Sequence, residues 1–386
     1  MTRAAPLDPV ALTRDLIRCP SVTPADGGSM DLVQRTLESL GFTCRRMRFG
    51  QIENLYARLG TARPNLCFAG HTDVVPVGDA AAWSKAPFDA DVTDGVLIGR
   101  GAVDMKSAIA AFIAAVSQVL AHGAPAGSLS LLITGDEEGP AEHGTKAVVA
   151  ALAAEGEIID HCVVGEPTSS ATLGDMIKIG RRGSIGATVV VEGKQGHVAY
   201  PDRAANPVPV LVRLLAALQA RRLDEGYEGF QPSNLEVTTI DVGNPATNVI
   251  PAAASAYLNI RFNPTHTGAA LAAWLEDEAR AANAGFSGNV IVTPKISGEA
   301  FLTAPGAFTA VVAGAVRAVG GVEPQLSTTG GTSDARFIRA LCPVVEFGLV
   351  GTTMHAVDER APTAEIEGLS AIYERIIGDY FTSFSS

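Results

Sequence analysis

Short apolar runs bounded by glycine or polar turns recur along residues 1–181 of the chain. Runs of this length are typical of buried strands, and Asn65–Ala69 and Cys162–Val164 are examples. Segments with helical spacing of apolar residues lie between such runs, over Pro9–Ile17, Ser29–Leu40, Ser107–Leu120 and Lys146–Ala154. The alternation predicts a mostly parallel mixed sheet with helices on both faces, which is an α/β fold.

The pattern changes between residues 182 and 294. The elements predicted there are strand Gly183–Glu192, helix Asn206–Arg222, strands Asn234–Asp241 and Ala254–Phe262, helix Gly268–Ala282 and strand Asn289–Pro294. This order is that of a ferredoxin-like α+β unit. We expect this unit to be inserted into a catalytic domain formed by residues 1–181 and 295–386. Its strand-rich outer edge needs a cover, and self-pairing of two copies would supply one, so a homodimer is expected.

Composition narrows the class of protein. With 386 residues, 47% hydrophobic and 18% charged, the chain is long and apolar enough to form more than one globular domain. A formal net charge of -12 argues against a nucleic-acid partner, although local arginines could still bind an anionic substrate. The five cysteines are scattered, which favours a reducing compartment. We see no signal region and no membrane-spanning run, so a cytoplasmic location is expected.

Imidazole and carboxylate side chains follow several of the predicted strands. They are His71 and Asp73, Glu137 and Glu138, Glu166, and His355, with Asp104 just before a predicted helix. Ligand sites in open α/β sheets form beyond the carboxyl ends of the strands, so we expect these groups around one crevice. Such nitrogen and oxygen donors suit zinc, and their excess over one ion predicts two metals that share a carboxylate.

Each of these residues also has a plainer interpretation when taken alone. His71 could be a loop histidine beside a solvated aspartate, Asp104 a helix N-cap, and Glu137-Glu138 an acidic surface turn. Their conjunction at several strand ends favours the metal site. In that reading one glutamate of the pair binds metal while the other moves protons, and Asp73 hydrogen-bonds the second ring nitrogen of His71.

The motifs that carry these residues resemble those of a known family. HTDVVP, GRGAVDMKS, GDEEGP and GEPTS are similar to motifs of the co-catalytic zinc peptidases and deacylases, which include carboxypeptidase G, acetylornithine deacetylase and aminoacylase. The resemblance spans nearly the whole chain, including the inserted domain. IKIGRRGSIGATVVVEGKQGHVAYP and TTGGTSDARF narrow it to a branch that removes a succinyl group from a diamino acid in bacterial lysine biosynthesis.

The resemblance implies a role for each candidate residue. One zinc ion would be held by His71 and Glu166, a second by Glu138 and His355, and Asp104 would bridge them. Cobalt is an alternative ion in one site. The remaining roles implied are general acid/base for Glu137, partner of His71 for Asp73, a cis peptide at Asp104-Met105, and oxyanion stabilisation in the partner subunit for His197.

A substrate of this branch carries several carboxylates, which arginine binds through paired hydrogen bonds. The substrate-binding candidates are Arg181, Arg182 and Arg261, with Ser184, Tyr200, Asn248 and the turn at Gly330 and Gly331 as neutral donors. Strand alternation lets only one of Arg181 and Arg182 face the cleft. Two alternatives stay open: another deacylase of the family, such as an acetylornithine deacetylase, or a non-catalytic zinc-holding module.

Overall fold

The computed structural model describes residues 6–385, which fold as two compact units. The first unit comprises the chain up to Ile179, Thr303–Ser327 and the chain from Ser333 onward. The second unit comprises Gly180–Leu302 and Thr328–Thr332, so it interrupts the first. These bounds differ by a few residues from the predicted 182–294, and they add a short turn that the sequence analysis left in the C-terminal segment.

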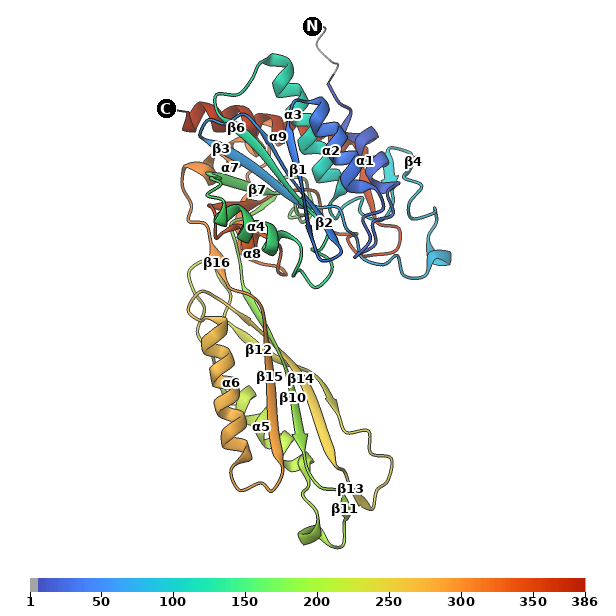
Figure 1. Ribbon diagram of the computed structural model, residues 1–386, viewed down its shortest axis with the longest axis vertical. Coiled ribbons are helices and arrows are strands. Elements are labelled where there is room, and N and C mark those ends of the chain that lie inside the picture. Colours follow the sequence, from blue (N-terminus) through green and yellow to red (C-terminus); the bar gives the residue numbers. More distant parts are fainter. Residues whose placement is uncertain (1–5, 386) are drawn as a thin grey trace. The chain divides into compact units, whose positions relative to one another are not determined.

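An eight-stranded mixed sheet forms the centre of the first unit (Figure 1). In spatial order its strands are β1 (Thr43–Phe49), β2 (Ile52–Leu59), β6 (Ser128–Thr134), β3 (Asn65–His71), β7 (His161–Val164), β18 (Val344–Glu346), β8 (Met176–Lys178) and β17 (Gln325–Ser327). The four consecutive strands β6, β3, β7 and β18 run parallel. Their carboxyl ends therefore meet at one edge of the sheet.

Helices cover both faces of this sheet, which confirms the predicted fold class. One face carries α1 (Pro9–Ile17), α2 (Ser29–Ser39), α3 (Lys106–His122), α7 (Ala307–Gly320) and α9 (Thr363–Phe384), whose apolar side chains share one core. Helices α4 (Thr145–Ala154) and α8 (Ala335–Ile338) lie on the opposite face (Figure 1). Every residue of β3 and β6 is buried, as expected for strands covered on both sides.

Strand β1 is the main element of this sheet that the sequence analysis did not predict. It was missed because Arg45, Arg46 and Arg48 interrupt the apolar pattern. These charged residues are tolerated because β1 is an edge strand that pairs only with β2. A smaller sheet of β4 (Asp91–Thr93), β5 (Val96–Ile98) and β19 (Arg360–Pro362) lies beside the main one, after the short 3-10 helix Ala80–Ala82. Strand β19 thus ties the start of α9 to the segment before α3.

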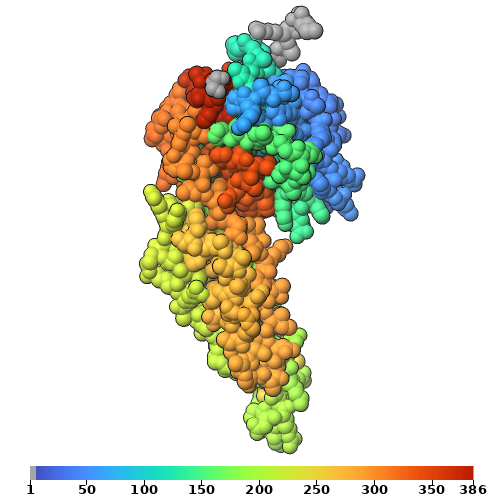
Figure 2. Space-filling model, turned by 60° about the vertical axis from the view of Figure 1, so that its left-hand side comes forward, coloured from blue at the N-terminus to red at the C-terminus, as the bar shows by residue number. Residues whose placement is uncertain are grey.

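The second unit is a four-stranded antiparallel sheet with two helices. Its spatial order is β12 (Asn234–Asp241), β14 (Ala253–Phe262), β10 (Gly183–Glu192) and β15 (Asn289–Gly298). Helices α5 (Pro207–Ala220) and α6 (Gly268–Asn283) pack on one face around a separate apolar core. The chain segments around α6 form much of this unit's surface in Figure 2, coloured yellow to orange. Short strand pairs complete it: β11 (Gly196–His197) with β13 (Val249–Ile250), and β9 (Gly180–Arg181) with β16 (Phe301–Leu302).

The element order of the second unit is the one that the sequence predicts, but β15 runs beyond the predicted end. The predicted strand ended at Pro294, and a proline inside a central strand would remove a hydrogen bond of the ladder. In the structure β15 is an edge strand and pairs only with β10, so it tolerates the proline and continues to Gly298.

Candidate metal centre

The predicted ligands lie at the edge where the four parallel strands end. His71 is the last residue of β3. Glu137 and Glu138 follow β6, Glu166 follows β7, and His355 lies in the loop between β18 and β19. The chain therefore delivers all five groups to one edge although they are far apart in sequence.

The side chains converge in overlapping groups whose donor atoms lie within 4.8 Å of one another. One group is His71, Asp104 and Glu166, and another is Asp104, Glu138 and His355. A third group contains His71, Glu137 and Glu138.

Asp104 belongs to the first two groups, and each of its oxygens faces a different histidine. Oδ1 lies 3.1 Å from Nε2 of His71, and Oδ2 lies 3.3 Å from Nε2 of His355. The outer members close the arrangement: Glu166 lies 3.8 Å from His71, and Glu138 lies 2.8 Å from His355. This is the geometry of a carboxylate placed to bridge two cations.

The alternative that Asp104 is a helix N-cap is wrong. The N-cap of α3 is Met105, which makes no side-chain capping hydrogen bond. The carboxylate of Asp104 is therefore available to the two histidines. The peptide bond between Asp104 and Met105 is cis, as the resemblance implies.

The side chain of Asp73 has a different contact from the predicted one. Nδ1 of His71 lies 2.9 Å from the backbone carbonyl oxygen of Asp73, whereas its carboxylate is 3.7 Å away. A donated Nδ1–H leaves the lone pair of Nε2 directed at the centre. The carboxylate instead accepts the backbone N–H groups of Glu137 and Glu138, at 3.2 and 3.0 Å. The prediction missed this because a main-chain acceptor leaves no signature in sequence.

The electrostatics of these groups fit a positive charge at the centre. Hydrogen bonds to Asp104 and Glu138 raise the pKa of His355 to about 10. Burial lowers the pKa of His71, but the hydrogen bond to Asp104 and the nearby carboxylates outweigh it, so this pKa is also raised. In the absence of metal, a proton on His355 thus offsets part of the negative charge of the carboxylates. The donor set of two imidazoles and several carboxylates fits two zinc-like ions in their place.

Glu137 is placed for proton transfer. Burial raises its pKa well above the usual range, and the charges of Glu166 and Asp334 raise it further. Its carboxylate lies within 4.8 Å of donor atoms of His71 and Glu138. A carboxyl group with a raised pKa beside a metal-binding cluster can act as a general base and then as a general acid.

Residues 67–379 match Peptidase family M20/M25/M40. The chain belongs to this family. Among curated relatives, a succinyl-diaminopimelate desuccinylase of Phenylobacterium zucineum is 74% identical over 98% of this chain and 100% of its own length. One of a Caulobacter species (strain K31) is 70% identical over the full length of both chains.

Solved structures of the M20 family share the fold. The metallo-carboxypeptidase Sso-CP2 of Sulfolobus solfataricus matches with a TM-score of 0.80 and 18% identity, over 97% of this chain and 100% of that chain. The YXEP protein of Bacillus subtilis, described as a dinuclear metal binding peptidase, matches with a TM-score of 0.72 and 15% identity, over 97% and 98%. In this M20 chain, no helix among residues 6–385 is long and apolar enough to cross a membrane.

The substrate-binding candidates all lie in the second unit. Arg181 is buried and donates to the carbonyl oxygen of Gly331 at 3.2 Å, while Arg182 is more exposed and donates to Asn234 at 3.0 Å. The two arginines thus differ in environment: Arg181 ends β9, and Arg182 lies between β9 and β10. Gly330 lies against the Arg181 guanidinium, and its φ of +105° is a backbone conformation that residues with a side chain rarely adopt.

The other candidates of this unit lie in two places. Ser184 is buried and accepts a hydrogen bond from Asn259, and it pairs across the sheet with Arg261. His197 and Tyr200 lie in an exposed segment with ring centroids 5.8 Å apart. Asn248 is exposed, and its carbonyl oxygen accepts the N–H of Val198.

Three charged residues of the first unit were missed by the sequence analysis. Asp334 is buried in the TTGGTSDARF stretch and acts on the pKa of Glu137. Arg100 and Glu359 form a buried ion pair of 2.8 Å beside Asp104. Arg100 stands inside the GRGAVDMKS motif and could have been singled out there, whereas nothing in the sequence around Glu359 marks it.

Proposed function

We propose that the protein is a two-zinc amidohydrolase that converts N-succinyl-LL-2,6-diaminopimelate and water into succinate and LL-2,6-diaminopimelate. The observation that carries this proposal is Asp104, whose two oxygens each face one histidine of the cluster. The substrate is proposed from the relatives named succinyl-diaminopimelate desuccinylase, which align over nearly the full chain. The reaction would serve diaminopimelate and lysine biosynthesis, in the cytoplasm.

The overlapping groups of donor atoms support two proposed metal positions. His71 and Glu166 would hold one zinc ion, Glu138 and His355 would hold the second, and Asp104 would bridge them. Cobalt could replace zinc in one position. When bound, the ions supply Lewis acidity, which polarises the amide carbonyl and lowers the pKa of the attacking water.

The protein's own groups would move the proton. Glu137 accepts a proton from the attacking water and then donates it to the departing amine nitrogen, so one carboxyl group acts first as base and then as acid. Asp73 orients Glu137 and Glu138 through their backbone N–H groups. His197 of the partner subunit would stabilise the charge that develops on the carbonyl oxygen.

Arginines of the second unit would bind the carboxylates of the substrate. Arg181, Arg182 and Arg261 offer paired N–H donors suited to carboxylate. The neutral donors Ser184, Tyr200, Asn248, Gly330 and Gly331 would complete the set. A substrate with several carboxylates needs such fixed donors, because an unpaired buried charge is costly.

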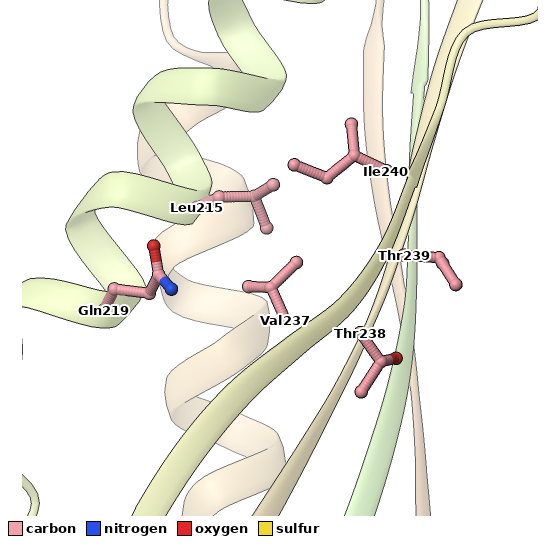
Figure 3. Close-up of a pocket in the computed structure, with 6 residues that line it drawn as sticks. All are labelled: Leu215, Gln219, Val237, Thr238, Thr239 and Ile240. Carbon is pink, nitrogen blue, oxygen red and sulfur yellow. The ribbon is translucent and has the colours of Figure 1, made fainter.

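A homodimer is supported by an uncovered edge in the second unit. A groove of about 450 Å³ lies between α5 and the edge strand β12 (Figure 3). Leu215 of α5 and Val237 and Ile240 of β12 point into it, and Ile240 is 60% exposed. A second copy that adds its own edge would cover these apolar side chains. Sedimentation of the purified protein tests this state.

The test of the function is hydrolysis of N-succinyl-LL-2,6-diaminopimelate by metal-depleted protein, with and without added Zn²⁺. We expect no turnover after depletion and recovery with zinc. A parallel assay with N-acetylornithine separates the alternative deacylase, because a desuccinylase should leave that substrate intact. Zinc binding without turnover of either substrate would favour the non-catalytic module instead.

A further inference from the structure

We infer that the buried ion pair of Arg100 and Glu359 positions the metal centre, by joining the three chain segments that carry His71, Asp104 and His355. This inference rests on the proposed metal centre. Both residues act through others: neither is among the groups of candidate ligands found within residues 6–385. They are therefore positioning residues.

Glu359 fixes the backbone that leads into Asp104. One of its oxygens, Oε1, accepts the N–H groups of Val103 and Asp104, at 2.8 and 3.0 Å. The other oxygen, Oε2, accepts the N–H of Gly101 at 3.0 Å and a guanidinium N–H of Arg100 at 2.8 Å. Three backbone donors on one rigid carboxylate hold this loop in a single conformation, and the loop sets the direction of the Asp104 side chain.

Arg100 extends the same connection to the other two ligand segments. Its Nη1 donates to the carbonyl oxygen of Ala356 at 3.2 Å, and its Nη2 donates to that of Pro76 at 3.3 Å. Ala356 follows His355, and Pro76 belongs to the loop that begins at His71. The guanidinium also lies over the ring of Trp83, 5.1 Å from its centroid.

The backbone of His355 shows why its segment needs such support. Its φ is +60°, a left-handed conformation that non-glycine residues seldom adopt without help from their surroundings. The hydrogen bond from Arg100 to the carbonyl oxygen of Ala356 holds the backbone one residue after His355. Glu359 holds the same loop from its other end, since its carbonyl oxygen accepts the N–H of Gly99 at 2.9 Å.

A contribution to folding stability does not by itself explain why the Arg100–Glu359 ion pair is present. Arg100 is 2% exposed and Glu359 is fully buried, so both charges are removed from water. The attraction within such a pair often only offsets the cost of its desolvation, and an apolar pair of similar size would serve folding as well. What an apolar pair could not supply is the set of directed hydrogen bonds to three backbone N–H groups and two carbonyl oxygens.

Three variants test this role: Glu359→Gln, Arg100→Lys and a control, Glu157→Gln. Glutamine lacks the second acceptor oxygen, and lysine cannot donate to Glu359, Ala356 and Pro76 in the same fork. The control breaks another ion pair of the first unit, between Glu157 and Arg58. Arg58 pairs with Ser130 near the start of β6, at the opposite end of that strand from Glu137.

The readouts are Zn²⁺ affinity of the full-length protein, by competition with a chromogenic chelator, and the visible absorption of the Co²⁺-loaded protein. We expect Glu359→Gln and Arg100→Lys to weaken binding of the less tightly held ion about 10–100-fold, as for other residues that orient metal ligands. Their Co²⁺ absorption should also change, because it reports coordination geometry. Glu157→Gln should leave both readouts unchanged, even if it lowers Tm.

Wild-type affinity and an unchanged Co²⁺ spectrum in the folded variants would overturn the positioning role. If Glu359→Gln does not fold, Arg100→Lys decides, because it keeps the buried charge pair. Equal weakening by Glu157→Gln would also overturn it, since the effect would then follow from general destabilisation. A wild-type protein that binds no Zn²⁺ is a separate outcome, and it would remove the proposed function together with this inference.

Discussion

The candidate metal centre of the first unit and the Asp224 site of the second unit both place an aspartate beside histidine, but they differ in the number of carboxylates around it. Asp224 accepts hydrogen bonds from the backbone of Gly226 and Ser233, from Asn263 and from His266. Burial alone would raise the pKa of Asp224, but these donors outweigh it and lower this pKa to about 2. The protein itself satisfies this carboxylate.

Asp104 at the candidate metal centre is satisfied in a similar way: burial would raise its pKa, but hydrogen bonds from His355 and His71 outweigh burial and lower it. The difference lies in its neighbours. Burial raises the pKa of Glu137, and the negative charges of Glu166 and Asp334 raise it further. An aspartate beside a histidine is thus no metal site by itself, as Asp224 and His266 show. The distinguishing feature is that several carboxylates gather around two histidines, since burying that charge without a cation is costly.

Glu137→Gln should give the largest effect. Glutamine keeps the size of the side chain but cannot carry the proton, so we expect turnover to fall about 10²–10⁴-fold while both metal ions stay bound. Steady-state hydrolysis and elemental analysis measure the two quantities. Glu142→Gln, an exposed glutamate of the same loop, serves as the control. A rate near that of the wild type would show that Glu137 is not the acid/base.

Replacing Asp104 and Asp224 in turn by asparagine should give the next largest effect. Asp104→Asn should weaken metal binding by at least about 100-fold, because the bridge loses an anionic ligand. Asp224→Asn should leave metal content intact and instead cost about 1–3 kcal/mol of folding free energy, since buried donors lose an acceptor. Metal analysis and urea unfolding measure both. Loss of metal in Asp224→Asn would contradict the conclusion that the Asp224 site plays no part in metal binding.

Asp73→Asn should have a smaller effect on turnover. Asp73 accepts the N–H groups of Glu137 and Glu138 on different oxygens, and asparagine replaces one of these oxygens with an NH2 donor, so the loop should be less well oriented. We expect kcat to fall about 10–100-fold with KM little changed. Equal changes in both constants would instead point to substrate binding.

Proton release should accompany metal binding and give the mildest effect. The pKa of His355 is raised to about 10 without metal, so this imidazole is protonated near pH 7. Metal binding must displace this proton, on the order of one per subunit, so apparent affinity should rise as pH rises toward the raised pKa of His355. Calorimetry in buffers of different ionisation enthalpy measures the release. Heats independent of the buffer would contradict it.

The sequence was sufficient for the parts of the fold that depend on apolar periodicity. Buried strands such as β3 and β10 and helix α3 were predicted within a few residues, because their residues are apolar wherever they face a core. The polar edge strand β1 was not, because a strand that faces water need not be apolar. The end of β15 was predicted too early, at Pro294, whereas the strand continues to Gly298 because an edge strand tolerates a proline.

The candidate site likewise has parts that the sequence predicts and parts that it does not. His71, Asp104 and Glu138 could be predicted because the required chemistry resides in their side chains. The contact of Asp73 could not, because the group that binds the His71 ring is its main-chain carbonyl. Glu359 was missed for a related reason: its partners are mostly backbone N–H groups, which every residue but proline possesses.

The insertion of the second unit between Glu166 and His355 has a consequence for biosynthesis. A ribosome completes His71, Asp104 and Glu166 before it begins the second unit, so one set of donors exists early in translation. The other set stays incomplete until His355 is made, after the whole second unit and β18. A nascent chain therefore holds only one of the two donor sets while residues 167–354 are made, and the paired site can arise only once the last strand end has joined the sheet.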